Sequence, residues 1–332
     1  YLIGVDIGGT KIAVNLIQCE KTKSSKSIPC FINNEHMNLS SKVEIRIPTE
    51  REAGYSNILK RISKKILEIL CQKKIKLTEI NSIGLALPGS VCPMKKMMTN
   101  GNSLVFQNKN ISVDLAHTLN FDKNIFVAND ADCFIFAEFC AGIGYEYLKD
   151  HNLNFNQVSA VGVILGTGLG AGTIISGRLY SGRRGAASEW GHTILNNNLL
   201  PCYCGEYSCA EQSLSGPGLE ASFNSRIYSQ IKGRPSSKDI FSMRDKHDPA
   251  AIAVIHSYKK SLSKFLSLII NTLDPHFIVL GGGLSQQEEL YRGLEKNVQN
   301  SCFVKENPPM IYKHKISDSA GSIGAALLSL IN

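Results

Sequence analysis

Residues 2–17 read LIGVDIGGTKIAVNLI, two apolar runs separated by a polar, glycine-rich stretch from Asp6 to Lys11. A Gly-Gly pair between two such runs predicts a β-hairpin. A dinucleotide-binding loop would instead place a helix after its glycines, so that the helix N-terminus holds the pyrophosphate. The stretch therefore argues against a dehydrogenase. It predicts a turn whose backbone N–H groups face a phosphate, with Asp6 holding a magnesium ion through water.

The same arrangement recurs at residues 161–175, VGVILGTGLGAGTII, about 160 residues further on. Here Gly166, Gly168 and Gly170 separate two apolar runs. A repeated strand, glycine turn and strand predicts two similar domains that face one another across a cleft, with both turns directed at one polyphosphate. No GxxxxGK[ST] phosphate loop occurs in the sequence.

Hydrophobic patterns between and after these turns predict the remaining elements. We expect strands at 43–47, 82–87, 125–130 and 276–283, helices at 56–70, from 252 to 273 and in the stretch after Asp318, and an exposed loop at 20–42. The polar turn NGNS at 100–103 is well placed to touch a ligand. The three glycines that end the strand at 276–283 suit either a nucleoside-binding site or the entry to a helix.

The run IFVAND places Asn129 and Asp130 at the carboxyl end of a buried strand. An aspartate there is ionised at neutral pH and can accept the proton of a hydroxyl group during phosphoryl transfer. The alternative is that Asn129 and Asp130 cap the helix that follows. The two roles are compatible.

Residues 185–211 contain His192, Cys202, Cys204 and Cys209 in the pattern H-x9-C-x-C-x4-C. Three thiols and one imidazole in so short a span are typical of a closed tetrahedral zinc site. Three buried thiols beside an unrelated histidine are the alternative. Glu189 and Glu211 flank the four ligands and are not needed to complete them, so we expect both to hydrogen-bond a hydroxyl-rich ligand.

The composition narrows the class of protein. A chain of 332 residues suits two domains, and 43% hydrophobic with 19% charged residues is typical of a soluble globular protein. Seven of the ten cysteines are scattered singly, which favours reduced thiols and a cytoplasmic location. The net charge of +8 comes from dispersed basic pairs without interleaved aromatics. We therefore expect neither a nucleic-acid nor a membrane partner.

Seven motifs, taken together, resemble the ROK (repressor, ORF, kinase) family. They are DIGGTK at 6–11, LPGS at 87–90, NDAD at 129–132, LGTGLGAG at 165–172, EWGH at 189–192, CYCGEYSCAE at 202–211 and VLGGG at 279–283. The resemblance implies an α/β, actin-like or hexokinase-type (ribonuclease H-like) duplicated two-domain ATPase fold with an interdomain cleft. It implies a small domain of 1–118 with 318–332, a large domain of 119–317 with a zinc loop at 192–209, and a homodimer.

The resemblance also implies the role of each site residue. Asp130 would be the catalytic base. The substrate-binding set would be Gly89, Asn102, Asn129, Asp130, Glu189, His192 and Glu211. The ATP-binding set would be Asp6, Gly8, Gly9, Thr10, Lys11, Gly166, Thr167, Gly168, Gly281, Gly282 and Gly283. His192 would face structural zinc with one ring nitrogen and the sugar with the other.

Three positions depart from the family pattern. Ser188 and Ser208 stand where the family usually has glycine, and Asp132 replaces a common asparagine. If either serine position requires a positive φ, serine carries a conformational cost there. None of the departures removes a zinc ligand or the base.

We predict ATP-dependent transfer of the γ-phosphoryl group to the 6-hydroxyl of a hexose of the fructose, mannose or glucose type. GLALPGS, the NGNS turn and PCYCG resemble the manno/fructokinase branch of the family. N-acetylglucosamine kinase is the alternative, because NDADCF and GVILGTGLGAG resemble that branch equally well. A sugar-sensing regulator is the alternative from another class. We expect no DNA-reading helix-turn-helix, since the first strand begins at Leu2, and Asp130 with both glycine turns favours the enzyme.

Overall fold

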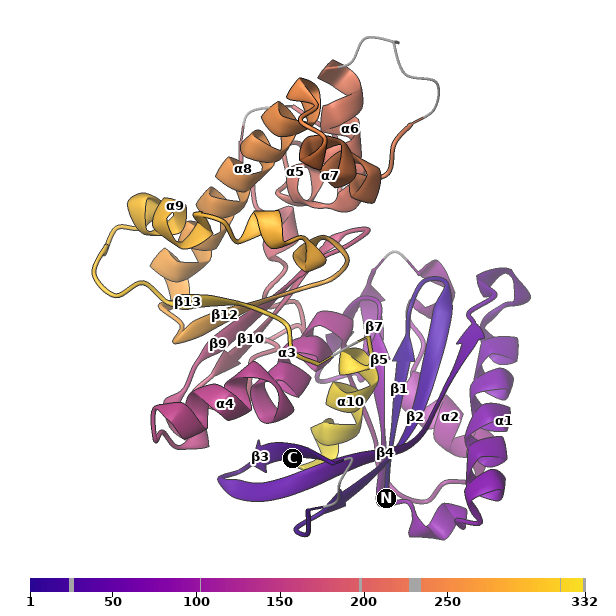
Figure 1. The fold of residues 1–332 in the computed structure, drawn as a ribbon. Coiled ribbons are helices and arrows are strands. Elements are labelled where there is room, and N and C mark those ends of the chain that lie inside the picture. The colour runs from indigo at the N-terminus through magenta and orange to yellow at the C-terminus, as the bar shows by residue number, and fades with distance from the viewer. Residues whose placement is uncertain (24–26, 102, 197–198, 227–233, 317, 331–332) are drawn as a thin grey trace. The chain divides into compact units, whose positions relative to one another are not determined.

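The computed structural model describes residues 1–23, 27–101, 103–196, 199–226, 234–316 and 318–330 (Figure 1). The chain divides into two compact units. Unit 1 comprises residues 1–159, 172–187 and 315–332, and unit 2 comprises residues 160–171 and 188–314. The functional domains expected from the sequence, 1–118 with 318–332 and 119–317, stay a prediction.

The sheet of unit 1 has six strands in the order β3-β4-β2-β1-β5-β8. Their bounds are β1 Leu2–Ile7, β2 Lys11–Glu20, β3 Ile28–Ile32, β4 Glu35–Pro48, β5 Ser82–Leu87 and β8 Ile125–Asn129. Strands β1 and β2 are antiparallel, with Ile7 opposite Ile12, whereas β1, β5 and β8 run parallel. The first hairpin and the strand at 82–87 are therefore confirmed. The strand predicted at 125–130 ends at Asn129, because Asp130 is already the first residue of the helix that follows.

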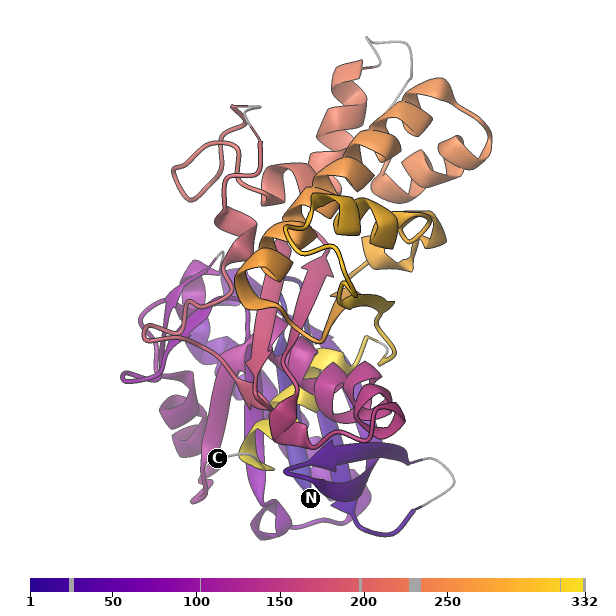
Figure 2. The same cartoon turned by 90° about the vertical axis from the view of Figure 1, so that its left-hand side faces the viewer.

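The stretch 20–42, which we expected to be a loop, contains strand instead. Strands β3 and β4 pair as an antiparallel hairpin, and β4 begins at Glu35, eight residues before the predicted strand at Val43 (43 − 35 = 8). Asn33 and Asn34 form its turn with φ of 50° and 67°. Two successive residues with positive φ are what a tight hairpin turn needs, and asparagine tolerates that conformation. The hairpin is indigo in Figure 2.

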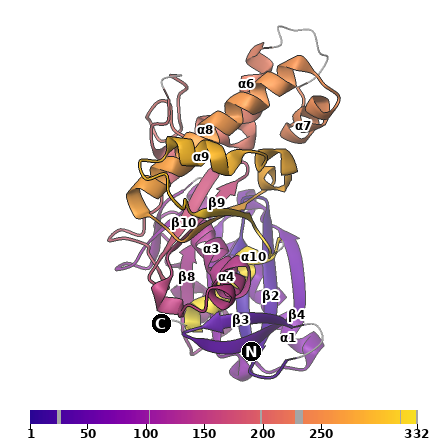
Figure 3. The ribbon, with the colours of Figure 1, turned by 60° about the vertical axis from the view of Figure 1, so that its left-hand side comes forward.

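Helices cover both faces of this sheet. Helices α1 (Tyr55–Lys73) and α2 (Ile111–Leu119) pack on one face through a core that includes Ile3, Val5 and Leu85. Because side chains alternate across a strand, Gly4 and Gly84 point to the other face, where α10 (Ala320–Leu327) lies. Helices α3 (Asp130–Ala141) and α4 (Ile143–Asp150) lie on that side too (Figure 3).

The approach of α10 is unusually close. A methyl group built on Gly4 would lie 2.8 Å from the carbonyl carbon of Ser322, and one on Gly84 would overlap the carbonyl group of Ala325. On the other side of α10, a methyl group on Gly324 would lie 2.6 Å from the carbonyl carbon of Cys133 in α3. The helix predicted after Asp318 is confirmed as α10. Glycine permits its close packing because no Cβ separates the backbones.

The second sheet has the order β11-β10-β9-β12-β13. Its strands are β9 Ala160–Leu165, β10 Leu169–Ile175, β11 Arg178–Leu179, β12 Phe277–Gly281 and β13 Met310–Lys313, with the part from Gly172 through β11 assigned to unit 1. The helices of unit 2 are α5 Glu211–Leu214, α6 Gly216–Arg226, α7 Ser237–Asp245, α8 Pro249–Leu273 and α9 Leu294–Ser301. The repeated strand, glycine turn and strand is confirmed.

Helix α8 shows how local residues set the bounds of an element. Its first helical residue is Pro249, and Asp248 caps the N-terminus by accepting a 2.8 Å hydrogen bond from the N–H of Ala251. It ends before Asp274, which has a φ of 44°, and Pro275 follows, as the sequence predicts. Its apolar side is the centre of the core of unit 2.

Short elements complete the description. A two-stranded ribbon pairs β6 (Ser90–Cys92) with β7 (Met97–Asn100). The 3-10 helices are Arg51–Ala53, Leu77–Glu79, Leu104–Phe106, Phe155–Gln157, Trp190–His192, Leu284–Gln286, Glu288–Leu290 and Leu328–Leu330. Within the described residues, no helix has both the length and the hydropathy that crossing a bilayer would require.

The packing of α10 predicts that Gly84→Ala destabilises the protein by at least about 2 kcal/mol, because the added methyl group must displace backbone rather than a side chain. Urea denaturation measures this change. Gly283→Ala is the matched control: no atom lies within 4 Å of the added methyl group, and φ is −63° there. Equal midpoints for the two variants would contradict the close packing.

Candidate functional site

The junction of β8 and α3 holds the candidate base. Asn129 caps α3: its Oδ1 accepts a 2.9 Å hydrogen bond from the N–H of Ala131, and its Nδ2 donates to the carbonyl of Gly89 over 3.2 Å. Asp130 is the first residue of α3, and its Oδ1 also accepts from the N–H of Ala131 at 2.9 Å. Asn129 is thus the cap, and Asp130 is held at the positive end of a helix, where an ionised carboxylate is stabilised.

Gly89 packs tightly against the turn after β7. A methyl group on Gly89 would lie 3.0 Å from the carbonyl carbon of Asn100 and 3.0 Å from Cα of Gly101. Because Asn129 also bonds to the carbonyl of Gly89, the structure brings together the turn at 88–90, the turn at 100–101 and the start of α3. Asn102, another candidate sugar-binding residue, lies outside the described residues.

Asp6, the last residue but one of β1, lies among charged neighbours. Burial, and after it the Asp130 carboxylate, raise the pKa of its carboxyl group to about 7, and Arg46 opposes the rise. The start of α10 closes over it, since a methyl group on Gly321 would lie 2.7 Å from Cγ of Asp6. Two carboxyl groups that repel one another in this way make an oxygen-rich place suited to a hard cation.

The glycine turns are formed in both units. In unit 1, the N–H of Gly8 donates to the carbonyl of Lys11 over 2.9 Å and closes the first turn. In unit 2, the N–H of Gly166 donates to the carbonyl of Gly168 over 3.0 Å. The residues at the tips of the two turns, Thr10 and Thr167, are exposed. Each turn thus presents an exposed tip on its own unit.

Glu211 forms a hydrogen bond at the end of the second glycine turn, Gly166 to Gly168. The sequence did not suggest this contact. Oε2 of Glu211 accepts a 2.9 Å hydrogen bond from the N–H of Leu169, the residue directly after the turn. A methyl group on Gly168 would lie 2.6 Å from the same oxygen. A residue predicted to hold the sugar therefore lies beside a turn predicted to hold phosphate. Glu189, by contrast, is exposed and precedes the 3-10 helix Trp190–His192.

The four predicted zinc ligands form one cluster. The ligand atoms of His192, Cys202, Cys204 and Cys209 all lie within 4.8 Å of one another. Sγ of Cys202 is 3.6 Å from Nδ1 of His192, and Sγ of Cys204 is 3.6 Å from Sγ of Cys209. A set of three thiolates and one imidazole fits a structural zinc ion with no open position.

The second ring nitrogen of His192 has a partner that we did not predict. Its Nε2 lies 2.9 Å from the hydroxyl oxygen of Tyr203, and the two rings meet edge to face at 5.1 Å. This contact fixes which nitrogen faces the thiols. Tyr203 lies between two of the cysteines in the sequence, yet nothing in the spacing distinguishes it from a surface tyrosine.

Both serines that replace family glycines have a positive φ, 66° at Ser188 and 62° at Ser208. That conformation is costly for a residue with a Cβ. At Ser208, which is buried, the hydroxyl oxygen accepts a 3.0 Å hydrogen bond from the N–H of Leu199. This bond, which glycine could not make, offsets part of the cost.

The glycines after β12 serve packing. Gly282 has a φ of 82°, and a methyl group there would lie 2.7 Å from the carbonyl carbon of Leu165 at the end of β9. Gly283 directly precedes the 3-10 helix Leu284–Gln286. The helix-entry interpretation therefore describes the structure, and the nucleoside-binding role of Gly281 to Gly283 stays a prediction.

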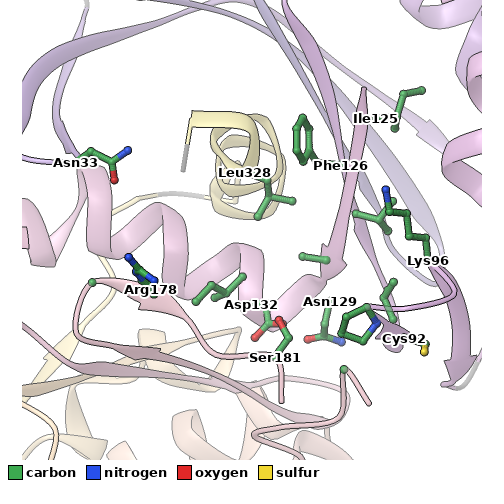
Figure 4. Close-up of a pocket in the computed structure, with 17 residues that line it drawn as sticks. Asn33, Cys92, Lys96, Ile125, Phe126, Asn129, Asp132, Arg178, Ser181 and Leu328 are labelled. Atoms are coloured by element: carbon green, nitrogen blue, oxygen red, sulfur yellow. The ribbon is translucent and has the colours of Figure 1, made fainter. Parts of the chain in front are cut away.

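A cavity of about 840 Å³ lies in unit 1 along the edge of β8 that is not paired with β5 (Figure 4). Asn129 and Asp132, at the junction of β8 and α3, line this cavity. Segments outside β8 and α3 contribute Lys96, Arg178 and Ser181 to the lining. Asp132, the departure from the family pattern, is buried at this border. The departure thus changes the charge beside the candidate base rather than at a distance from it.

Comparison with known proteins gives matches over nearly the whole chain. The ROK family model matches residues 2–331. The N-acetyl-D-glucosamine kinase of Pasteurella multocida (strain Pm70) is 30% identical over 340 residues, which cover 98% of each chain. The N-acetylgalactosamine kinase AgaK of Shewanella sp. (strain ANA-3) is 30% identical over 336 residues, 98% of this chain and 95% of that protein.

A solved structure with a similar fold is a ROK family glucokinase from Streptomyces griseus, in complex with glucose and AMPPNP. It has a TM-score of 0.71 and 22% identity, and covers 98% of both chains. The predicted α/β fold of the actin-like, hexokinase type is confirmed.

The raised pKa of Asp6 predicts an unusual pH dependence of stability. The folded chain keeps this proton up to about pH 7, whereas an unperturbed carboxyl releases it near 3.8, so the contribution of Asp6 to stability falls as the pH rises between these values. Asp6→Asn removes the titration. In magnesium-free buffer, we expect the urea midpoint of the parent protein to fall more from pH 5 to pH 8 than that of the variant. Parallel pH profiles would contradict the raised pKa.

Proposed function

Because the chain belongs to the ROK family, we propose that it is an ATP-dependent kinase that phosphorylates the 6-hydroxyl group of an N-acetylhexosamine. The observation that carries this proposal is 30% identity, over 98% of the chain, to a protein named N-acetyl-D-glucosamine kinase. This was the alternative interpretation of the sequence. The preferred one, a hexose of the fructose, mannose or glucose type, has weaker support, since the glucokinase is only 22% identical.

The proposed base is Asp130. Phosphoryl transfer to an alcohol needs a group that accepts the hydroxyl proton while the acceptor oxygen is held in line with the phosphoryl group. The N–H of Ala131 orients the Asp130 carboxylate, and the N-terminus of α3 favours its ionised form. Asp130 would then take the proton of the 6-hydroxyl group on one carboxylate oxygen.

The other proposed roles follow from the chemistry of the side chains. Gly8 to Lys11 and Gly166 to Gly168 would hold the phosphates through backbone N–H groups. Magnesium, held through water by Asp6, would neutralise phosphate charge when bound. Glu189 and Glu211 would accept hydrogen bonds from sugar hydroxyls, as would His192 once Tyr203 moves from its Nε2. The homodimer and the cytoplasmic location stay predictions.

The choice among N-acetylhexosamines is left to experiment, since a relative of equal identity is named N-acetylgalactosamine kinase. Coupled ADP release should be measured with N-acetylglucosamine, N-acetylgalactosamine, N-acetylmannosamine, glucose, mannose and fructose. We expect the highest kcat/KM with N-acetylglucosamine. A preference for an unsubstituted hexose would contradict the proposed class, and no turnover of any sugar would favour the sensor alternative.

Asp130→Asn tests the base. We expect turnover to fall by at least about 100-fold, since general-base catalysis contributes that much or more, while sugar binding measured by calorimetry is retained. Asp122→Asn, the same chemical change at an exposed position before β8, is the matched control and should keep full turnover. Turnover that is unchanged in the Asp130 variant would refute this role.

Zinc binding by the Cys3His cluster is proposed on its geometry and donor chemistry. Elemental analysis should find one zinc per chain. Cys204→Ser should lower the zinc content and reduce the affinity for sugar, because the loop that carries Glu189 and His192 loses its support. Cys71→Ser, an exposed thiol on α1, is the control and should retain the metal. A metal-free protein with full sugar affinity would refute the proposal.

A further inference from the structure

Arg51 lies against the first glycine turn. A methyl group built on Gly9 would lie 3.2 Å from Cζ of Arg51 and would overlap its terminal nitrogen Nη2. The guanidinium group therefore occupies the space that a side chain at position 9 would fill. The missing side chain of Gly9 thus admits a cation to the surface of the turn.

The segment that carries Arg51 is fixed to the same turn. Thr49, fully buried, donates its N–H to the carbonyl of Thr10 over 2.9 Å and its hydroxyl to the carbonyl of Gly8 over 2.8 Å. These two bonds lie two residues before Arg51. They set the distance between the backbone at position 51 and the turn.

Arg61 of α1 supports this segment from the other side. It donates to the carbonyls of Thr49 and Pro48 over 3.2 and 2.8 Å, and it forms a 3.0 Å ion pair with Glu50. Glu50 has a φ of 50°, an uncommon conformation for a residue with a side chain. Strain of this kind persists only where surrounding contacts hold it. Here it bends the chain directly before Arg51.

Arg51 itself lacks the partners that Arg61 has. Its Nε is buried without a hydrogen-bond partner, and no ion pair joins Arg51 to any other residue that the structure describes. A buried donor left unpaired is costly. A guanidinium group has five donors in a planar fork that matches the oxygens of a phosphate. A negatively charged partner would therefore stabilise the guanidinium group at this position.

We propose that Arg51 is an additional phosphate-binding residue, which contacts the polyphosphate of ATP or ADP at the Gly8–Gly9 turn. This inference rests on the proposed kinase function and extends its nucleotide site beyond the glycine turns. Within unit 1, Arg51 would add a fixed positive charge to the dipoles of the backbone N–H groups at the turn. Because a nucleoside monophosphate has no polyphosphate to reach this charge, the contribution of Arg51 depends on the number of phosphates.

Calorimetric titration with Mg·ADP and with AMP at fixed ionic strength tests the proposal. For Arg51→Gln we expect the ADP affinity to fall about 10- to 100-fold, the loss of one or two charge-assisted hydrogen bonds, and the AMP affinity to change by less than about two-fold. Arg51→Lys, which keeps the charge but not the fork, should lie between. Lys64→Gln, the loss of one exposed charge on α1, should bind like the parent protein.

Each other outcome contradicts a distinct statement. An unchanged ADP affinity in Arg51→Gln, with normal binding by the parent protein, would overturn the role of Arg51 alone. An equal loss of affinity for ADP and for AMP would show that Arg51 only supports the turn. The same conclusion would follow if neither Arg51→Gln nor Arg51→Lys folds, as measured by circular dichroism. Absence of ADP and ATP binding by the parent protein would overturn the proposed kinase function, and this inference with it.

Discussion

Backbone-to-backbone packing of α10 is the constraint on which unit 1 depends. Gly4 and Gly84 bring the sheet against one side of the helix, and Gly324 brings α3 against another. Because β1 carries Asp6 near its end and α3 begins with Asp130, this packing also sets where the two carboxyl groups lie. A bulkier contact at α10 would separate them. The burial of Asp6, and the nearby Asp130 carboxylate, which together raise its pKa, are therefore a consequence of glycine positions.

In the candidate site of unit 1, the acidic side chains and the basic side chain lie in different places. The carboxyl groups of Asp6 and Asp130 gather where a cation and a hydroxyl group are expected, and Arg51 lies on the glycine turn where phosphate is expected. In unit 2 the order is different, since Glu211 is bonded at the second turn itself. A carboxylate there repels phosphate oxygens, which agrees with the proposed role of Glu211 beside an acceptor hydroxyl rather than beside the middle of a polyphosphate chain.

Features that depend on a short local sequence pattern were predictable from the sequence. The hairpin around Gly8, the end of α8 and the zinc spacing are all local patterns. The β3–β4 hairpin was missed because polar composition concealed alternation, although the Asn33-Asn34 pair is a turn signal. The contacts of Glu211 with Leu169 and of Arg51 with Gly9 join residues 42 apart in both cases (211 − 169; 51 − 9), and no local pattern encodes such pairs.

The division of the chain into segments has a consequence for synthesis. All residues of unit 2 precede Lys315, whereas unit 1 is completed only by residues 315–332. As the ribosome extends the chain, β1 and β5 are therefore made early and wait for α10 to cover them. Until then the part of the first sheet that α10 covers is bare, with backbone rather than side chains exposed at Gly4 and Gly84. Surface that is left uncovered in this way favours aggregation until the helix that covers it has been made.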